Sequence, residues 1–287
     1  PNLYLITGDL GFSVFEPFKE RYGHRFINAG IAEQTMIGLA AGLAMVGKRV
    51  YVYSIIPFGT MRCFEQIRIN LCYQNLPVTI FCAGGGYSYG ADGTTHHAIE
   101  DVAIMRALPG MTVVAPGSTF EAAQLAPQVH TLTGPSYVRL AKNEELVTYP
   151  AGTTITLGKA ITLIDNKRTL LVATGNALDL AWSVCLALRE HGMDIGLVSM
   201  PTLKPLDTTP FENPTLEAVF TIEEHSIIGG LGSAVAQHLA QNVHRKIKFH
   251  AFGINDFYAH EVDTRSELNK RAGLSVEAVT ITIRKML

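Results

Sequence analysis

Short apolar runs that predict β-strands alternate with longer runs of helical period along nearly the whole chain. The strand-like runs are continuous and apolar rather than alternating with polar residues, which is typical of parallel strands covered by helices on both faces. They lie at residues 3–8, 49–54, 77–86, 111–117, 135–141, 169–175, 194–200, 218–226 and 246–253. Helices are predicted over residues 14–23, 31–46, 64–75, 98–108, 119–132, 177–192 and 229–243, with two short helices after residue 264. The pattern therefore predicts an α/β fold with mainly parallel sheets.

The length of 287 residues predicts two domains, each large enough for a core of its own. Between about Lys142 and Gly158 the alternation loosens into KNEELVTYPAGTTITLG, which is typical of a linker. After this stretch the α/β alternation restarts. We therefore expect a first α/β domain over residues 1–145, a linker over 146–158 and a second α/β domain over 159–287.

Composition excludes several classes of protein. The chain is 47% hydrophobic and 17% charged, with a formal net charge of −2, so it carries no electrostatic signature of a nucleic-acid or membrane-surface protein. No apolar run approaches the roughly 20 residues of a membrane span, and no signal peptide is visible. Because Cys63, Cys72, Cys82 and Cys185 lie singly in apolar segments, we expect reduced core thiols of a cytoplasmic protein, with disulfides as the alternative. The sequence begins at Pro1 rather than at methionine, so this residue is not expected to be the natural N-terminus.

One acidic residue, Glu33, heads the small and apolar stretch NAGIAEQTMIGLAAG. In open parallel sheets, ligands collect at the carboxyl ends of strands, and Glu33 lies in a loop of this kind. A carboxylate in the first turn of a helix is stabilised by the positive end of the helix dipole, so a purely local role is one interpretation. A carboxyl group that serves a bound ligand is the other interpretation.

A second polar segment, AGGGYSYGADGTTHHAIED, follows another strand-like run. Its glycines fit neither the GxxxxGK[ST] of a P-loop nor the strand–GxGxxG–helix spacing of a dinucleotide site. Asp92, His96 and His97 are candidates for ligand binding or catalysis, with ordinary loop positions as the alternative. Glu100 and Asp101 are interpreted as first-turn carboxylates of the helix that follows.

Arg139, at the end of PSYVRL, is a third polar side chain that follows a strand-like run. The segment GGLGSAV also follows a strand and opens a helix, but its spacing is wrong for a dinucleotide site, and we interpret it as a tight turn. No GxSxG nucleophile elbow, HExxH motif or paired metal-ligand cluster is present, so no metal ligand is expected from this chain.

Several blocks of the sequence occur together in a characteristic order. They are GDLGF, INAGIAEQTMIGLAAGLAMVG, FEQIR, GADGTTHHAIEDVAIMRALPGMTVVAPG, VSMPTLKPLD, TIEEHSIIGGLGSAV and SELNKRAGLS. Over essentially its whole length, the chain resembles the C-terminal half of a transketolase, which is a pyrimidine-binding domain followed by the transketolase C-terminal domain. Deoxyxylulose-phosphate synthases and the β subunits of 2-oxo-acid dehydrogenase E1 components share this layout. The block DGTTHHAIEDVAIMRALPGM is closer to the transketolase and synthase branches.

A full-length transketolase carries, ahead of this region, a domain that binds diphosphate and a metal ion through a GDG…N motif. This sequence contains neither GDG nor that domain. The resemblance therefore implies a split enzyme, in which an N-terminal transketolase-like chain supplies the diphosphate site and the ligands of a Mg2+ or Ca2+ ion. Because active sites in this family form between the pyrimidine domain of one protomer and the diphosphate domain of another, we expect an α2β2 heterotetramer.

The resemblance also implies roles for residues near the cofactor, thiamine diphosphate. Glu33 is implied to hydrogen-bond N1′ of the aminopyrimidine, which lets the 4′-imino group act as an internal base. Phe58, in SIIPFGT, is implied as the aromatic residue against which the aminopyrimidine lies, with Ile56 as its neighbour. For Arg62 two interpretations stand, a residue of the cofactor pocket or a partner of an acidic neighbour.

Substrate-binding roles are implied for Asp92 and His96, which lie at the DGxTH positions that contact sugar hydroxyls, and imidazole titrates near neutral pH. A phosphate-binding role is implied for Arg139, whose forked guanidinium suits a phosphate. The chain departs from the family at CAGGGYS, where transketolases carry THDS, and at HHA, where they carry HQP. In transketolases the THDS histidine, which is missing here, helps hold phosphorylated substrates. The candidate substrates therefore also include modified, unphosphorylated or biosynthetic sugars and non-ketose donors such as pyruvate.

We therefore expect the β-like subunit of a two-chain, thiamine-diphosphate-dependent transferase that moves a two-carbon ketol unit between sugars or sugar phosphates in carbohydrate metabolism. One alternative is a chain like that of deoxyxylulose-phosphate synthase or an E1 β subunit, which decarboxylates a 2-oxo acid. Another is a non-catalytic partner subunit. The presence of Glu33, Asp92 and His96 argues against the last alternative.

Overall fold

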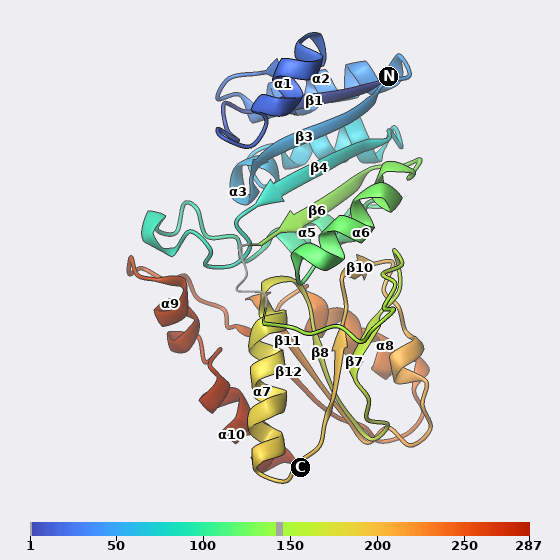
Figure 1. Cartoon of the computed structure of the whole chain (residues 1–287), viewed down its shortest axis with the longest axis vertical. Coiled ribbons are helices and arrows are strands. Elements are labelled where there is room, and N and C mark those ends of the chain that lie inside the picture. The colour runs from blue at the N-terminus through green and yellow to red at the C-terminus, as the bar shows by residue number, and fades with distance from the viewer. Residues whose placement is uncertain (1, 142–145) are drawn as a thin grey trace.

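A computed structural model describes residues 2–141 and 146–287 of the chain. Two α/β units lie one above the other along the long axis of the molecule (Figure 1). Each unit is built around one sheet. Pro1, at the start of the first predicted domain, lies outside the described residues. So do residues 142–145, which end that domain and begin the loosened stretch.

The first sheet has seven strands in the order β10-β5-β6-β4-β3-β1-β2. These strands are β1 (Leu3–Thr7), β2 (Phe26–Asn28), β3 (Arg49–Ile55), β4 (Val78–Ala83), β5 (Thr112–Val114), β6 (Ser136–Leu140) and β10 (Thr202–Lys204). Every neighbouring pair is parallel except β10 with β5, which is antiparallel. Strand β10 comes from the second half of the sequence and joins that half to the edge of the first sheet. The sequence does not predict it, because a run of three residues carries too little periodicity.

The second sheet has five strands in the order β12-β11-β8-β9-β7. These strands are β7 (Ile161–Ile164), β8 (Thr169–Ala173), β9 (Gly196–Ser199), β11 (Ala218–Ser226) and β12 (Lys248–Ile254). All neighbours are parallel except the antiparallel pair β7 and β9. The two sheets confirm the predicted architecture of two successive α/β units with mainly parallel strands.

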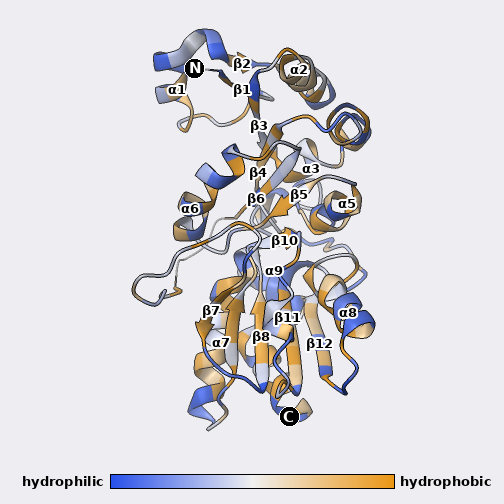
Figure 2. Ribbon diagram, turned by 90° about the vertical axis from the view of Figure 1, so that its right-hand side faces the viewer, coloured by the Kyte–Doolittle hydropathy of each residue, from blue (hydrophilic) through white to orange (hydrophobic). Residues whose placement is uncertain are grey.

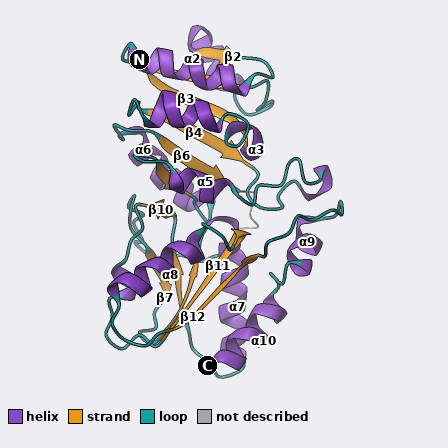
Figure 3. Cartoon of the chain, turned by 180° about the vertical axis from the view of Figure 1, so that it is seen from behind, coloured by secondary structure: helices purple, strands orange, loops and turns teal. Residues whose placement is uncertain are grey.

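Helices cover both faces of each sheet, which explains why the strands are apolar on both sides. They are α1 (Glu16–Tyr22), α2 (Glu33–Met45), α3 (Ile56–Gly59), α4 (Phe64–Gln66), α5 (Asp101–Ala107), α6 (Thr119–His130), α7 (Leu178–Glu190), α8 (Leu231–Asn242), α9 (Arg265–Arg271) and α10 (Val276–Met286). Figure 2 shows α1 and α6 on one side of the first sheet and α2 and α5 on the other. The view from behind in Figure 3 places α2, α5 and α8 toward the reader.

Two predicted helices differ in detail from those observed. The helix predicted over residues 64–75 begins as the short α4 and continues as a π-helical turn, η2 (Ile67–Cys72), in which the Tyr73 amide donates to the Arg68 carbonyl at 2.9 Å. The helix predicted from residue 31 begins at Glu33, after a backbone turn at Gly30 with a φ of +73°. Both elements therefore exist, with boundaries shaped by their neighbours.

Apolar side chains on adjacent strands form the core of each unit. Ile6, Val52 and Ile80 are fully buried and stand in register across β1, β3 and β4. The hydropathy colouring of Figure 2 follows this pattern, with apolar strands in both sheets. The four cysteines are free thiols. Within the described residues, no helix combines the length and the apolar character that a membrane span requires.

Candidate functional site

Three of the predicted site residues follow neighbouring parallel strands of the first sheet. Glu33 begins α2 after β2, and Phe58 lies in α3 directly after β3. His96 lies in the loop of residues 84–100, which follows β4. Strands β2, β1, β3 and β4 are adjacent and parallel, so the loops at their carboxyl ends meet at one edge of the sheet. This edge is the candidate site.

The Glu33 side chain is buried, with 3% of its surface exposed. Its Oε2 atom accepts a hydrogen bond from Nη1 of Arg62 at 3.0 Å. The backbone of Gly8, in the GDLGF block, approaches the same carboxylate, since a Cβ there would lie 3.6 Å from Cγ of Glu33. Arg62 is 46% exposed, so the ion pair runs from the interior to the surface. This contact corresponds to the second interpretation of Arg62, the partner of an acidic neighbour.

Aromatic contacts extend from this ion pair to His96. Cζ of Arg62 lies 4.2 Å from the centre of the Phe58 ring. The imidazole of His96 packs edge-on against the same ring, with ring centres 5.1 Å apart, and lies 6.2 Å from the ring centre of Tyr89. We call Glu33, Phe58, Arg62, Tyr89 and His96 the Glu33–His96 cluster. It combines a carboxylate, a guanidinium, an imidazole and a flat aromatic face.

Tyr89 is the member of the cluster that was not predicted from the sequence. Its ring lies against Gly84, where a Cβ would come within 2.2 Å of the ring. Gly84 also has a φ of +100°, which favours glycine. The first glycine of GGG therefore leaves room for the Tyr89 ring beside the site. This glycine is the one feature of the sequence that points to a ring at this place.

The remaining predicted residues of this edge lie around the cluster. Ile56 is fully buried in α3, two residues before Phe58. Asp92 is exposed in the 3-10 turn η3 (Gly90–Asp92) of the loop that carries His96. It lies outside the contacts that join the cluster. His96 Nδ1 is 3.0 Å from the hydroxyl of Thr95.

His97 points into the protein rather than into the cluster. It is 3% exposed, and its ring packs edge-on against Tyr87 with centres 4.9 Å apart. Burial lowers the pKa of His97, so the imidazole is neutral at physiological pH. Of the two candidate histidines, the structure therefore brings only His96 to Phe58.

The structure does not bring Arg139 to the cluster, and its predicted phosphate-binding role needs correction. The side chain is 3% exposed, and its Nε donates to Oδ2 of Asp101 at 2.9 Å. Nη1 donates to Asn176 Oδ1, and Nη2 donates to the carbonyls of Ala98 and Glu224, at 2.9 to 3.0 Å. A buried guanidinium requires such acceptors, and here they come from both units. Arg139 is a buried contact between the units.

Asp101 is correspondingly more than a first-turn carboxylate. It is fully buried, and its Oδ2 also accepts a hydrogen bond from the hydroxyl of Tyr137 at 2.7 Å. Burial raises the pKa of Tyr137 well above its ordinary value, so the phenol remains a donor. The helix dipole interpretation of Asp101 therefore accounts for one part of its environment, and its bonds to Arg139 and Tyr137 account for another.

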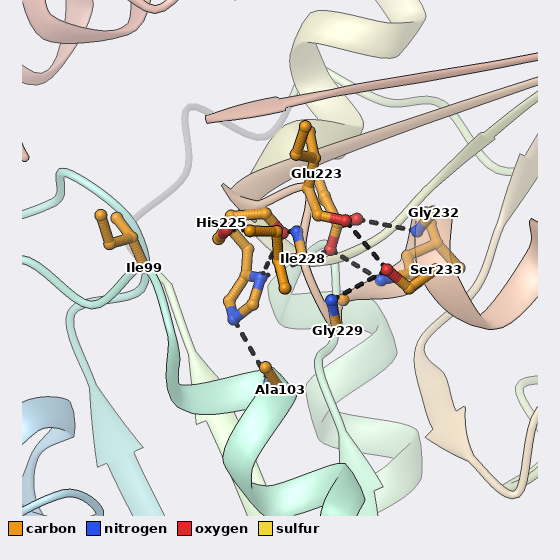
Figure 4. A network of polar contacts seen from close by, with 12 residues as sticks. Ile99, Ala103, Glu223, His225, Ile228, Gly229, Gly232 and Ser233 are labelled. Atoms are coloured by element: carbon orange, nitrogen blue, oxygen red, sulfur yellow. Dashed lines mark hydrogen bonds and ion pairs between the residues drawn. The ribbon is translucent and has the colours of Figure 1, made fainter. Parts of the chain in front are cut away.

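Three consecutive buried polar residues at the end of β11, namely Glu223, Glu224 and His225, were also not predicted from the sequence. Glu223 accepts the amide hydrogens of Leu231 and Gly232, at 2.7 and 2.8 Å, and so caps the start of α8 (Figure 4). The run TIEEHS looks like an ordinary strand, and its partners lie on other elements. Local sequence carries no signal for their burial.

His225 reaches from the second unit to the first. Its Nε2 accepts the amide hydrogen of Ala103, in the first turn of α5, at 3.3 Å, and its Nδ1 lies 2.8 Å from the carbonyl of Ser226 (Figure 4). These partners assign the proton to Nδ1 and leave Nε2 as the acceptor. Burial is the main cause that lowers the pKa of His225 to about 4. The imidazole is therefore neutral.

The described residues offer no metal centre. Within residues 2–141 and 146–287, no group of three or more His, Cys, Asp or Glu side chains is placed to hold a metal ion. The Glu33–His96 cluster itself offers hydrogen-bonding and aromatic groups.

Comparison with known proteins shows matches along both units. Residues 1–145 match the family described as "Transketolase, pyrimidine binding domain", and residues 158–279 match "Transketolase, C-terminal domain". The chain is 35% identical to an apulose-4-phosphate transketolase subunit of Phocaeicola vulgatus, over 84% of this chain and 78% of that protein. It is 32% identical to the 6-deoxy-6-sulfo-D-fructose transketolase subunit SqwH of a Clostridium species, over 91% of this chain and 81% of that protein.

A solved structure described as "Split gene transketolase, inactive beta4 tetramer" has the same fold. Its TM-score is 0.88 and its identity 32%, over all of this chain and 92% of that one. The two curated relatives named above are both described as subunits, and this chain covers 78% and 81% of their lengths.

Replacing His225 by glutamine is expected to remove a loss of stability in acid. The pKa of His225 is about 4 in the folded chain, against about 6.5 when unfolded. The stability that depends on neutral His225 is therefore complete above pH 6.5 and is lost as the pH falls toward 4, by about 3 kcal/mol. Urea titrations from pH 7 to pH 4 should show the unfolding free energy of His225→Gln rising by this amount relative to wild type.

Glu223 acts in the opposite direction, because burial raises its pKa to about 7, and its protonation favours the folded chain as the pH falls from 7 toward 4.5. Both proteins retain this residue, but its Oε2 lies 3.8 Å from Nδ1 of His225, so the contributions of the two residues are coupled. The exposed His191→Gln serves as control and should follow wild type. Parallel curves for His225→Gln and wild type would contradict a neutral, buried His225.

Proposed function

The chain belongs to the transketolase family, and we propose that it is the C-terminal, β-like subunit of a two-chain enzyme that uses thiamine diphosphate. The proposed reaction is transfer of a two-carbon ketol unit between sugars or sugar phosphates. The observation that carries the proposal is the buried carboxylate of Glu33, joined through the Arg62 guanidinium to the Phe58 ring at the carboxyl edge of the first sheet.

The Arg62 guanidinium provides a test of whether this site fits the cofactor. It is a flat, hydrogen-bonding cation that lies over Phe58 at 4.2 Å and donates to Glu33 at 3.0 Å. An aminopyrimidine is also flat, and its ring nitrogen hydrogen-bonds a carboxyl group. The Glu33 and Phe58 side chains therefore already contact one flat, hydrogen-bonding group between them, which supports the fit. Entry of the ring requires Arg62 to move aside.

Thiamine diphosphate supplies a carbanion equivalent at C2 of its thiazolium ring, which makes cleavage of the bond beside a ketose carbonyl possible. The part of this chain would be to hold a proton between the buried Glu33 carboxyl group and the pyrimidine N1′. Phe58 orients the ring by stacking. His96, one ring away, would exchange a proton with a sugar hydroxyl, and Asp92 on the same loop would contact another hydroxyl.

A partner chain is part of the proposal, and we assign the diphosphate and metal site to it, since no group of three or more metal-ligating side chains occurs among the described residues. The outer face of α2 supports a neighbour at this place. A Cβ placed at Gly38 or Gly42 would meet no other element of the described chain within 4 Å. Leu39 and Met45 are exposed on the same helix, and Val46 is exposed directly after it. An uncharged helix face next to Glu33 suits coverage by another chain. We propose an α2β2 assembly with the diphosphate-binding chain.

The proposed substrates are sugars or sugar phosphates. Relatives are described as acting on apulose 4-phosphate and on a sulfonated fructose, which carry different anionic groups. Arg139 is not placed in the proposed substrate site, because its guanidinium is held by protein acceptors. The alternatives are decarboxylation of a 2-oxo acid and a subunit without catalysis.

Glu33→Gln is expected to abolish cofactor activation in the reconstituted two-chain enzyme. Glutamine keeps the shape of the side chain but cannot share a proton with the pyrimidine nitrogen, so kcat should fall by about 10²–10⁴-fold. Steady-state assays of the variant and of the control Glu65→Gln, an exposed glutamate near Arg62 in the sequence, measure this directly. Full activity of Glu33→Gln would refute the proposed mechanism.

A donor screen distinguishes ketol transfer from its alternatives. The chain is co-purified with its N-terminal partner and assayed with ketoses, ketose phosphates and pyruvate. Ketol transfer predicts release of an aldose from a ketose donor, whereas release of CO2 from pyruvate would favour the decarboxylating alternative. An intact complex that turns over none of these donors would favour a non-catalytic subunit.

The isolated chain is expected to bind thiamine diphosphate weakly. Contacts to the diphosphate are charge-assisted, so without the partner the dissociation constant should be at least about 100-fold weaker than in the complex. Calorimetric titration with the cofactor and Mg2+, for the isolated chain and for the complex, gives both values. Tight, metal-dependent binding by the isolated chain would contradict the division of the site between two chains.

A further inference from the structure

The loop of residues 84–100, which carries His96, is held mainly by the second unit. Its two ends are first joined to each other by paired hydrogen bonds between Gly86 and Ala98, at 2.8 and 2.9 Å. His96 therefore lies in a closed excursion of the chain. Contacts that hold the Gly86–Ala98 bridge in place therefore also hold the two ends of the segment that contains His96.

One residue of β11, Glu224, holds both sides of this bridge. On one side its Oε1 accepts the amide hydrogen of Tyr87 at 2.7 Å. On the other side its backbone carbonyl accepts from Nη2 of Arg139 at 3.0 Å, and the same Nη2 donates to the Ala98 carbonyl at 2.9 Å. Residue 224 is thus tied to the neighbour of Gly86 and, through one guanidinium, to Ala98.

The Glu224 side chain is itself tightly oriented. It is 3% exposed, and its Oε2 accepts from Nε and Nη2 of Arg265 at 2.9 and 2.8 Å. Close approach of the loop depends on glycine, because a Cβ at Gly86 would lie 2.4 Å from Oε1 of Glu224. Gly85 plays the same part for Arg139, whose Nη1 would lie 2.5 Å from a Cβ there. The glycine run matches no phosphate-binding motif. Its lack of side chains lets the backbone approach the Glu224 carboxylate and the Arg139 guanidinium.

Further contacts between the loop and the second unit lie on either side of His96. The Thr94 hydroxyl donates to the carbonyl of Ala259 at 2.6 Å, and the amide of Ser226 donates to the carbonyl of Ile99 at 2.7 Å. Figure 4 shows Ile99 beside the end of β11, near His225. The loop thus meets the second unit before and after the histidine.

We propose that Glu224 is a positioning residue for the loop of residues 84–100. Through Glu224, the second unit sets the position of His96 relative to Phe58 and Glu33. The inference rests on the proposed function for its catalytic consequence, since His96 is assigned there to proton exchange with the sugar. Glu224 touches no reacting atom. It acts through the Tyr87 amide and the Gly86–Ala98 bridge.

The preceding residue, Glu223, provides a matched control. It has the same side chain and is equally buried, with 1% of its surface exposed. Its carboxylate accepts from the amides of Leu231 and Gly232 at the start of α8, within its own unit (Figure 4). Glu223→Gln should therefore disturb α8, whereas Glu224→Gln should disturb the loop.

Hydrogen–deuterium exchange of the isolated chain tests the structural part of the proposal. Glutamine at position 224 presents an NH2 group either to the Tyr87 amide or to Arg265, so one donor loses its acceptor. We expect amides in peptides that cover residues 86–98 to exchange at least about 10-fold faster in Glu224→Gln, with α8 unchanged. Glu223→Gln should give the reverse pattern. Equal exchange of the loop in both variants, or an unchanged loop in Glu224→Gln, would overturn the proposal.

Kinetics of the two-chain enzyme test the catalytic part, with the donor identified by the screen described above. Glu224→Gln is expected to raise KM for the sugar and to lower kcat/KM by about 10-fold or more, because the loop is misplaced. Glu223→Gln should lower the thermal midpoint but leave kcat/KM unchanged at temperatures where it is folded. Unaltered kcat/KM in Glu224→Gln would overturn the positioning role. If wild type itself shows no ketol transfer, the proposed function fails, while the exchange experiment still decides how the loop is held.

Discussion

The buried guanidinium of Arg139 is the contact on which the arrangement of the two units depends. A cation taken out of water is tolerated only where acceptors replace its hydration, and the penalty for leaving it unpaired is several kcal/mol. Its acceptors are Asp101 and Ala98 from the first unit and Asn176 and the Glu224 carbonyl from the second. Separation of the units would leave the guanidinium with Asp101 and Ala98 but would remove its two acceptors from the second unit, Asn176 and the Glu224 carbonyl. The interface is therefore fixed by charge satisfaction as well as by apolar packing.

This constraint extends to the candidate site because the acceptors of Arg139 include the base of the loop that carries His96. Ala98 is bonded both to the guanidinium and to Gly86, and Glu224 completes the same frame from the second unit. The other half of the cluster, Glu33 with its neighbours, is placed independently by the strands of the first sheet. The first sheet alone thus positions Glu33 and its neighbours, whereas the loop that carries His96 is held by both units.

These two parts differ in how far the sequence predicts them. Glu33, Phe58 and His96 lie at one edge of the first sheet, because they follow adjacent parallel strands and such strand ends share one edge. The alternation of strands and helices is read correctly, since strands covered on both faces are apolar throughout. Strand β10 and the placement of Arg139 were not predicted, because both are decided by partners far away in the chain. Glu224 lies 137 residues from its partner Tyr87, and nothing in the run TIEEHS distinguishes a buried carboxylate from one at a strand end.

The two interpretations of Glu33 from the sequence, a helix-dipole partner and a ligand group, are compatible in the structure. The start of α2 and the Arg62 guanidinium together stabilise the carboxylate, so the chain can bury it without a cofactor. Arg62 does so as a flat cation stacked on Phe58. Under the proposed function, exchange of this guanidinium for an aminopyrimidine keeps both a stacked ring and a hydrogen bond to Glu33, while the half-exposed Arg62 returns to solvent. Under that proposal the Glu33 carboxylate has a hydrogen-bonding partner both before and after the cofactor binds, so its burial is compensated in either state.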